Sequence, residues 1–154
     1  RQILLSYDGT PGAMQARLGA MFHDSKWRDD EAYVMRRQAM ALLPGAWSCT
    51  AAARLRPPGG EDTSTVFGKA DSTPYEAISV PTLLVAGAED RLREPGYAQQ
   101  LGDRIAGCRV EVFEQCGHCP NIEQADRFNA LVIDFMQDVH RHSAAEAVVP
   151  GSDQ

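Results

Sequence analysis

Long apolar runs are absent from this 154-residue sequence, and stretches such as VPTLLVAGA are far shorter than a membrane-spanning helix requires. Basic runs are also absent, and the formal net charge of −6 argues against nucleic acids and anionic membranes as partners. No basic segment followed by an apolar one opens the chain, so we expect no secretion signal. The hydrophobic content of 44% and the charged content of 23% are those of a soluble globular protein.

Cysteine is scarce as well. The chain has four cysteines, Cys49, Cys108, Cys116 and Cys119. They are too few and too unevenly spaced for a disulfide scaffold, which favours a reducing, cytoplasmic location for the protein. An initiator methionine is also missing, because the chain opens on RQILLSYDGTPG in the middle of a pattern. We therefore expect the sequence to be a piece of a longer protein.

The first half of the chain is predicted to be helical. Helices are indicated over residues 10–24, 29–43 and 46–55 by apolar residues at helical spacing. Their apolar stripes are modest, as expected of a lid, which we place at residues 1–56. A stretch rich in Pro, Gly, Ser and Asp follows and is predicted to be a connecting loop over 57–77.

The second half changes character. Strands are predicted over 80–88 and 108–114, and helices over 94–107 and 121–142. This order is typical of a parallel crossover in an α/β fold. We assign residues 78–140 to this core segment and 141–154 to a flexible tail. Two strands do not form a stable parallel sheet alone, so we expect further strands to be supplied from elsewhere.

The segment VFEQCGHCPNIEQ contains a Cys-Gly-His-Cys sequence from Cys116 to Cys119, which is also the active-site tetrapeptide of disulfide isomerases. A thioredoxin-like fold needs further strands after this motif, but only one predicted helix and a polar tail follow Cys119. We therefore reject a redox role, although a disulfide between these two cysteines stays open. A metal site needs a second pair of ligands. His140 and His142 lie at the far end of the last helix, so no metal site is predicted.

The remaining interpretation concerns His118. It follows a predicted parallel strand, and Asp90 follows the other one, so the two loops should lie side by side. An aspartate there can orient the imidazole, as in a nucleophile–histidine–acid triad. Two alternatives stay open: His118 as a loop histidine bonded to backbone, and Asp90 as a turn-capping residue.

These residues resemble the C-terminal half of an α/β-hydrolase. ISVPTLLVAGAEDRLREP is similar to the seventh strand of that fold and its acid-bearing loop, and VEVFEQCGHCPNIEQADRFNALVIDFM to the eighth strand, histidine loop and last helix. Within the superfamily the pattern is most similar to the meta-cleavage-product hydrolases, which cleave carbon–carbon bonds without a cofactor. YDGTP, MFHD and PGAW resemble the lid that this group inserts before the seventh strand.

The resemblance implies roles for individual residues. Asp90 would be the acid and His118 the general base. Arg36 falls near a substrate-binding lid arginine, although its neighbour Arg37 leaves the register open, and a solvated helix charge is the alternative. Cys119 would face the substrate at a position where the subgroup usually has tryptophan. Glu123 is expected to support the loop rather than perform chemistry.

The fold requires a serine in a Gly-x-Ser-x-Gly turn, and no serine in this chain has those glycines. We therefore expect a small-molecule hydrolase of C–C or ester bonds only when the N-terminal half of the fold is present as a partner, and an inactive chain without it. Alternatives are a carboxylesterase, a dehalogenase or epoxide-hydrolase relative, or a non-catalytic binding module that associates through the exposed edge of PTLLVAGA, for example as a homo-oligomer.

Overall fold

A computed structural model of the chain describes residues 7–46 and 72–147. The chain divides into two compact units between Pro74 and Tyr75. Nearly all of the helix expected over 46–55, and most of the expected connecting loop, lie outside the described residues. Within the described ranges, no helix has both the length and the apolar character needed to cross a membrane.

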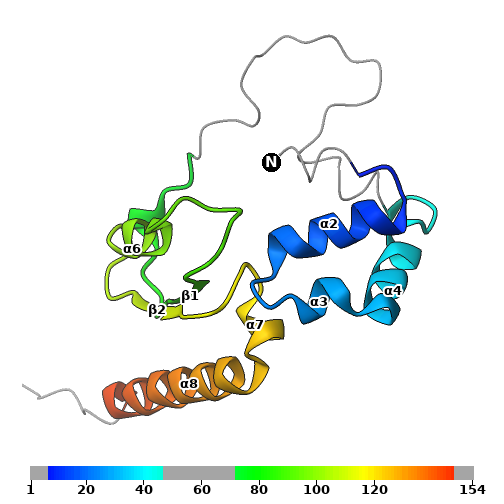
Figure 1. The fold of residues 1–154 in the computed structure, drawn as a ribbon. Helices are drawn as coiled ribbons and strands as arrows, with labels where there is room; N and C mark the ends of the chain where they lie inside the picture. The colour runs from blue at the N-terminus through cyan, green and yellow to red at the C-terminus, as the bar shows by residue number, and fades with distance from the viewer. Residues whose placement is uncertain (1–6, 47–71, 148–154) are drawn as a thin grey trace, which may run out of the picture. The chain divides into compact units, whose positions relative to one another are not determined.

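Over residues 7–46, the first unit contains the helices α2 (Pro11–Met21), α3 (Lys26–Asp29) and α4 (Glu31–Ala41) (Figure 1). The short helix α3 was not predicted. Side-chain caps determine where the two longer helices begin. The Thr10 hydroxyl accepts a hydrogen bond from the Ala13 amide at 3.2 Å, and Asp30 accepts one from the Tyr33 amide at 3.0 Å.

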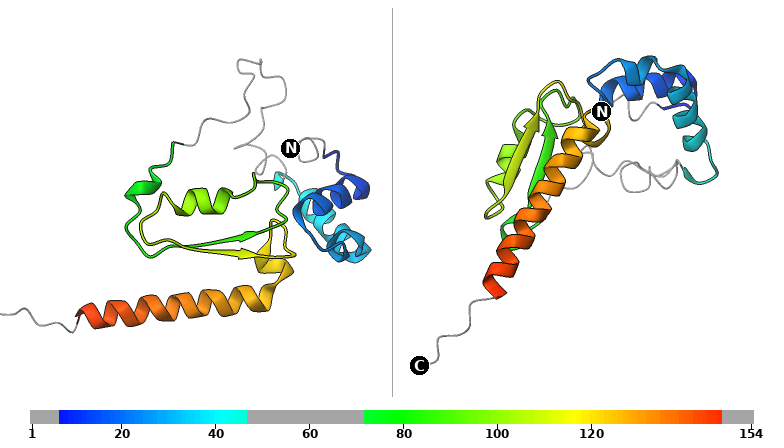
Figure 2. Two further views of the ribbon diagram at one scale, coloured as in Figure 1. Left: turned by 60° about the vertical axis from the view of Figure 1, so that its left-hand side comes forward. Right: turned by 90° about the horizontal axis from the view of Figure 1, so that it is seen from below.

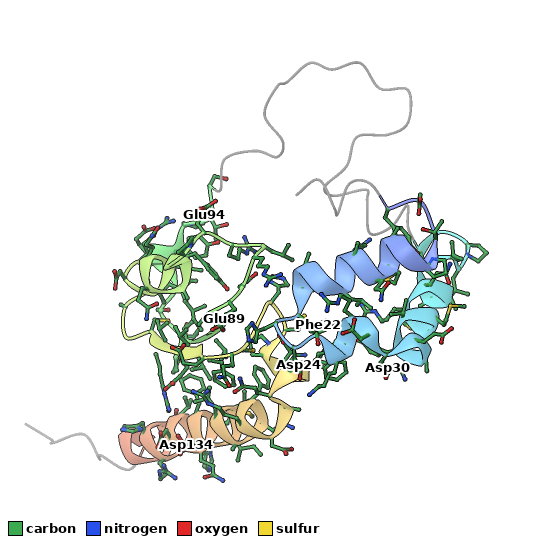
Figure 3. The ribbon with its side chains drawn as sticks, in the orientation of Figure 1. Phe22, Asp24, Asp30, Glu89, Glu94 and Asp134 are labelled. Carbon is green, nitrogen blue, oxygen red and sulfur yellow. The ribbon has the colours of Figure 1, made fainter. Side chains whose placement is uncertain are left out.

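The described residues of this unit bury five hydrophobic side chains. Its buried side chains come mainly from α2 and α4: Met14, Leu18, Phe22, Tyr33 and Val34. The Phe22 ring stacks on that of Trp27, with 5.4 Å between the ring centroids. Met40 and Leu43 fit the apolar stripe of the helix predicted over 29–43, but they are 59% and 60% exposed. Figure 3 labels Phe22, Asp24 and Asp30, which lie in the connections between these helices.

The second unit contains a two-stranded parallel sheet of β1 (Leu83–Gly87) and β2 (Arg109–Phe113). It begins with the 3-10 turn η1 (Tyr75–Ala77). The register runs from Leu83 opposite Arg109 to Gly87 opposite Phe113, so the predicted parallel crossover is confirmed. The crossover helix α6 (Tyr97–Gly102) is shorter than expected. Its N-terminal limit is set by Gly96, whose φ of +75° is not helical.

The predicted last helix is divided in two at Gln124, whose φ of −130° and ψ of 53° interrupt the helix between α7 (Pro120–Glu123) and α8 (Ala125–Ala147). Figures 1 and 2 show α6 and α8 on opposite sides of the sheet. An ion pair of 3.2 Å between Arg109 and Asp134 joins β2 to α8. Because α8 continues to Ala147, it enters the segment that was expected to be a flexible tail.

Candidate active site

The loops that follow the two strands are bonded to each other through their backbones. The Ala88 amide donates to the Phe113 carbonyl at 2.9 Å, and the Glu89 amide donates to the Cys116 carbonyl at 3.0 Å. This extends the parallel pairing beyond the ends of β1 and β2. The two loops therefore lie side by side at the carboxyl edge of the sheet, as the sequence predicted.

Gly87 permits this close approach. A Cβ atom at this position would lie 2.0 Å from the Gly117 carbonyl oxygen and 2.2 Å from that of Cys116. Both neighbours are backbone atoms and cannot rotate away as a side chain can. Only glycine fits where the end of β1 meets the loop that follows β2.

Asp90 and His118 meet across the two loops. The imidazole Nδ1 of His118 lies 2.9 Å from Oδ2 of Asp90. The other carboxylate oxygen of Asp90 accepts a hydrogen bond from the Leu92 amide at 2.8 Å. The turn-capping alternative for Asp90 thus holds for one oxygen, while the other is available to orient His118.

The exposure of the two side chains differs in a way that suits a proton-transfer pair. The Asp90 side chain is only 4% exposed, whereas that of His118 is 34% exposed. A carboxylate only accepts hydrogen bonds, so in a neutral imidazole the Nδ1 atom carries the proton and Nε2 is the basic nitrogen. That tautomer follows from the hydrogen-bond partner.

Three further side chains hold the loop before His118. Glu89 accepts from the Cys116 amide at 2.8 Å, and Glu123 accepts from the Gly117 amide at 2.6 Å. The Gln124 amide nitrogen donates to the Glu114 carbonyl at 2.7 Å. The expectation that Glu123 supports the loop is confirmed. Glu89 and Gln124 were not found from the sequence, because an acid before Asp90 and a glutamine within a helical pattern carry no distinguishing spacing.

The Cys116 thiol is fully buried beneath this loop. Burial raises its pKa to about 12, and the nearby carboxylate of Glu123, 3.8 Å from the sulfur, adds to the effect. Such a thiol stays protonated and unreactive near neutral pH. Cys108, Cys116 and Cys119 are free cysteines, and Cys49 lies outside the described residues.

We expect the pKa of Cys116 to make the second unit less stable in alkali. The unfolded thiol loses its proton near its ordinary pKa of 9, whereas the folded thiol keeps it until about pH 12. The free energy of unfolding should therefore fall between these pH values, by at most about 1.4 kcal/mol per pH unit. Urea unfolding at several pH values would measure this slope. A Cys116→Ala variant should lose the contribution, and equal slopes in both proteins would contradict it.

Cys119 stands at the beginning of α7, and its carbonyl accepts from the amides of Ile122 and Glu123 at 2.9 and 3.0 Å. It is half-buried next to His118 in the chain. Across residues 7–46 and 72–147, no three His, Cys, Asp or Glu side chains form a group that could hold a metal ion.

The two candidate arginines of the lid have different surroundings. Both guanidinium groups lie near the Tyr33 ring, at 5.2 Å from its centre for Arg36 and 5.9 Å for Arg37, but Arg36 is exposed and Arg37 is half-buried. Arg37 lines a cavity of about 270 Å³ within the helical unit. The other residues lining this cavity are mostly apolar: Met14, Arg17, Leu18, Met21, Met40, Ala41 and Ala46. The structure therefore distinguishes two arginines that the sequence pattern could not.

A sequence model described as the Alpha/beta hydrolase family matches residues 3–131. The 2-hydroxymuconate semialdehyde hydrolase of Pseudomonas putida is 32% identical over 128 residues, which cover 81% of this chain and 43% of that protein. Human monoacylglycerol lipase ABHD6 is 37% identical over 65 residues, which cover 42% of this chain and 19% of the lipase. The chain thus spans less than half the length of these two curated relatives.

Among solved structures, the meta-cleavage product hydrolase CumD from Pseudomonas fluorescens IP01 superposes with a TM-score of 0.70 at 23% identity. The match covers 89% of this chain and 49% of that one, and at this identity it concerns the fold alone. The expected fold class, two parallel strands with flanking helices from the C-terminal part of an α/β-hydrolase, is confirmed. The chain belongs to the alpha/beta hydrolase family.

Proposed function

We propose that this chain supplies the histidine and the acid of a Ser-His-Asp triad in a hydrolase. The observation that supports this most directly is the 2.9 Å contact between His118 Nδ1 and the buried Asp90 carboxylate. In the proposed mechanism, Nε2 of His118 takes the proton of a serine hydroxyl or a water molecule. Asp90 keeps the imidazole in the right tautomer and stabilises its charged form.

The nucleophile and the oxyanion hole must come from another part of the fold, because no serine here has the Gly-x-Ser-x-Gly context. Without these groups most of the rate enhancement is lost. We propose that residues 1–56 form a lid over a small apolar substrate that carries a carboxylate or a carbonyl group. Cys119 would contribute to the substrate-facing surface beside His118.

We expect the purified 154-residue chain to hydrolyse neither p-nitrophenyl esters nor dienoates above the buffer rate. Fused behind the N-terminal part of the Pseudomonas putida relative, it should gain turnover that His118→Ala removes. Initial rates measured by absorbance test both expectations. Turnover by the chain alone that disappears with His118→Ala would contradict the proposal, because a nucleophile would then lie within these residues.

Two types of bond are candidates for cleavage, a C–C bond and an ester bond. The relatives include a hydrolase of a semialdehyde and a lipase, and we favour the C–C bond because the former matches 81% of the chain. Ester hydrolysis is the second candidate, since Cys119 replaces the tryptophan usual in the C–C subgroup. Comparing kcat/KM for a dienoate and an ester in the completed protein distinguishes the two.

Substitution of the two lid arginines tests which of them binds the carboxylate group of the proposed substrate. Arg36 was assigned by resemblance, but Arg37 lines the lid cavity, so we propose Arg37 as the carboxylate ligand. Losing a hydrogen bond to a charged group costs about 1.5–3 kcal/mol, so Arg37→Ala should raise KM for a carboxylate-bearing substrate by roughly 10-fold or more. Arg36→Ala is the matched control and should change KM little. A larger effect of Arg36→Ala would restore the original assignment.

A further inference from the structure

The histidine loop, residues 114–118, follows β2 and is held by side chains in addition to the backbone bond from the Glu89 amide to the Cys116 carbonyl. Glu89 and Glu123 accept hydrogen bonds from the successive amides of Cys116 and Gly117, at 2.8 and 2.6 Å. Cys116 and Gly117, whose amides donate these hydrogen bonds, are both buried. A buried amide without an acceptor is costly, so the two carboxylates determine how the peptide planes before His118 can lie.

The backbone of this loop is strained as well. Gln115 has a φ of +55°, which a non-glycine residue adopts only at a cost. Its carbonyl and that of Glu114 both accept from the Gln124 side chain, at 3.4 and 2.7 Å. A conformation of this kind persists where the surrounding bonds over-determine it.

The two carboxylates come from different elements of the second unit. Glu89 directly precedes Asp90 in the turn after β1, where Figure 3 labels it, and Glu123 belongs to α7. The turn that carries the acid therefore also holds the loop that carries the histidine. The 2.9 Å contact between Asp90 and His118 tolerates little movement, because a hydrogen bond is lost beyond about 3.5 Å.

We propose that Glu89 and Glu123 are positioning residues for His118. They act through the Cys116 and Gly117 amides, and they hold the loop so that Nδ1 of His118 faces Asp90. Neither would touch the substrate. This inference rests on the proposed function of His118, and it assigns to the two glutamates a role that differs from a general contribution to folding.

The test uses the completed hydrolase, in which this chain is fused behind the N-terminal part of the Pseudomonas putida relative and labelled with ¹⁵N. The Nδ1 proton of His118 and the exchange rates of the Cys116 and Gly117 amides are measured by NMR in Glu89→Ala and Glu123→Ala. Each change should speed exchange of its own amide by roughly 10- to 100-fold, the equivalent of losing a hydrogen bond to a charged group. The Nδ1 proton resonance should be lost, while exchange of the α8 amides stays unchanged. Glu114→Ala, an exposed acid of the same loop, is the matched control and should preserve both signals.

The Gln variants separate positioning from folding. Glu89→Gln and Glu123→Gln keep an acceptor oxygen, so the His118 resonance should persist while exchange of the target amide rises only several-fold. Alanine variants that fold and keep the wild-type resonance would overturn the inference. If an alanine variant does not fold, wild-type exchange of the target amide in the Gln variant would overturn it. The proposed function fails separately: it would be contradicted by a wild-type chain whose His118 resonance is absent or is unaffected by Asp90→Asn.

Discussion

Replacing Asp90 by asparagine is expected to lower kcat of the completed hydrolase by about 10⁴-fold, with only a small change in KM. Asparagine presents an NH₂ group that can donate to Nδ1 of His118, which would leave the proton on Nε2 and remove the base. The bond from the Leu92 amide to the other side-chain position can persist with an amide oxygen. The fold should therefore survive, and kcat and KM for a p-nitrophenyl ester measure the effect.

Asp126→Asn is the control for this change, because Asp126 is an exposed acid in the first turn of α8. It removes the same charge from an exposed position of the same unit, and kcat should stay within about two-fold. If Asp90→Asn lowered kcat by less than about 10-fold, orientation of His118 by Asp90 would not be its role.

The second large effect is expected for Gly87→Ala. Its new Cβ would lie about 2 Å from two backbone carbonyl oxygens, so the strand end and the histidine loop must separate. Over-packing of this kind costs about 3 kcal/mol or more when backbone has to move. A loss of that size should lower the melting temperature of the second unit by about 10 °C or more. Thermal unfolding followed by circular dichroism measures it.

Gly12→Ala is the matched glycine substitution. Gly12 lies in α2, and a Cβ there meets no other atom within 4 Å. Alanine is favoured over glycine in a helix by roughly 0.5–1 kcal/mol, so this variant should be slightly more stable than the wild type. Equal melting temperatures for Gly87→Ala and the wild type would mean that the two loops can separate without loss.

The two strands and the loops that follow them could be predicted from the sequence, because each strand has a local pattern of apolar residues. The apolar run up to Gly87 and the alternating residues after Cys108 predicted both strands, and the matching positions of the loops that follow predicted that Asp90 and His118 lie side by side. The proximity of these two residues was predictable because parallel strands end at the same edge of a sheet. The catalytic role itself stays a prediction.

Other features could not be predicted because they depend on contacts between distant residues. The division of the last helix at Gln124 is stabilised by carbonyl groups of the histidine loop, which a helical pattern does not reveal. The role of Glu89 depends on the backbone register between the two loops. Met40 and Leu43 fit an apolar stripe, but nothing in a stripe tells which part of it a neighbouring helix will cover.

The interruption at Gln124 also has a mechanical consequence. A continuous helix from Pro120 to Ala147 would act as a lever, and bending of its distal end would move the turn that carries Glu123. Because the helix is broken at Gln124, a displacement of α8 is not transmitted to α7 and the histidine loop as it would be along one rigid helix. A fusion partner or an immobilisation tag attached beyond α8 should therefore exert little torque on His118.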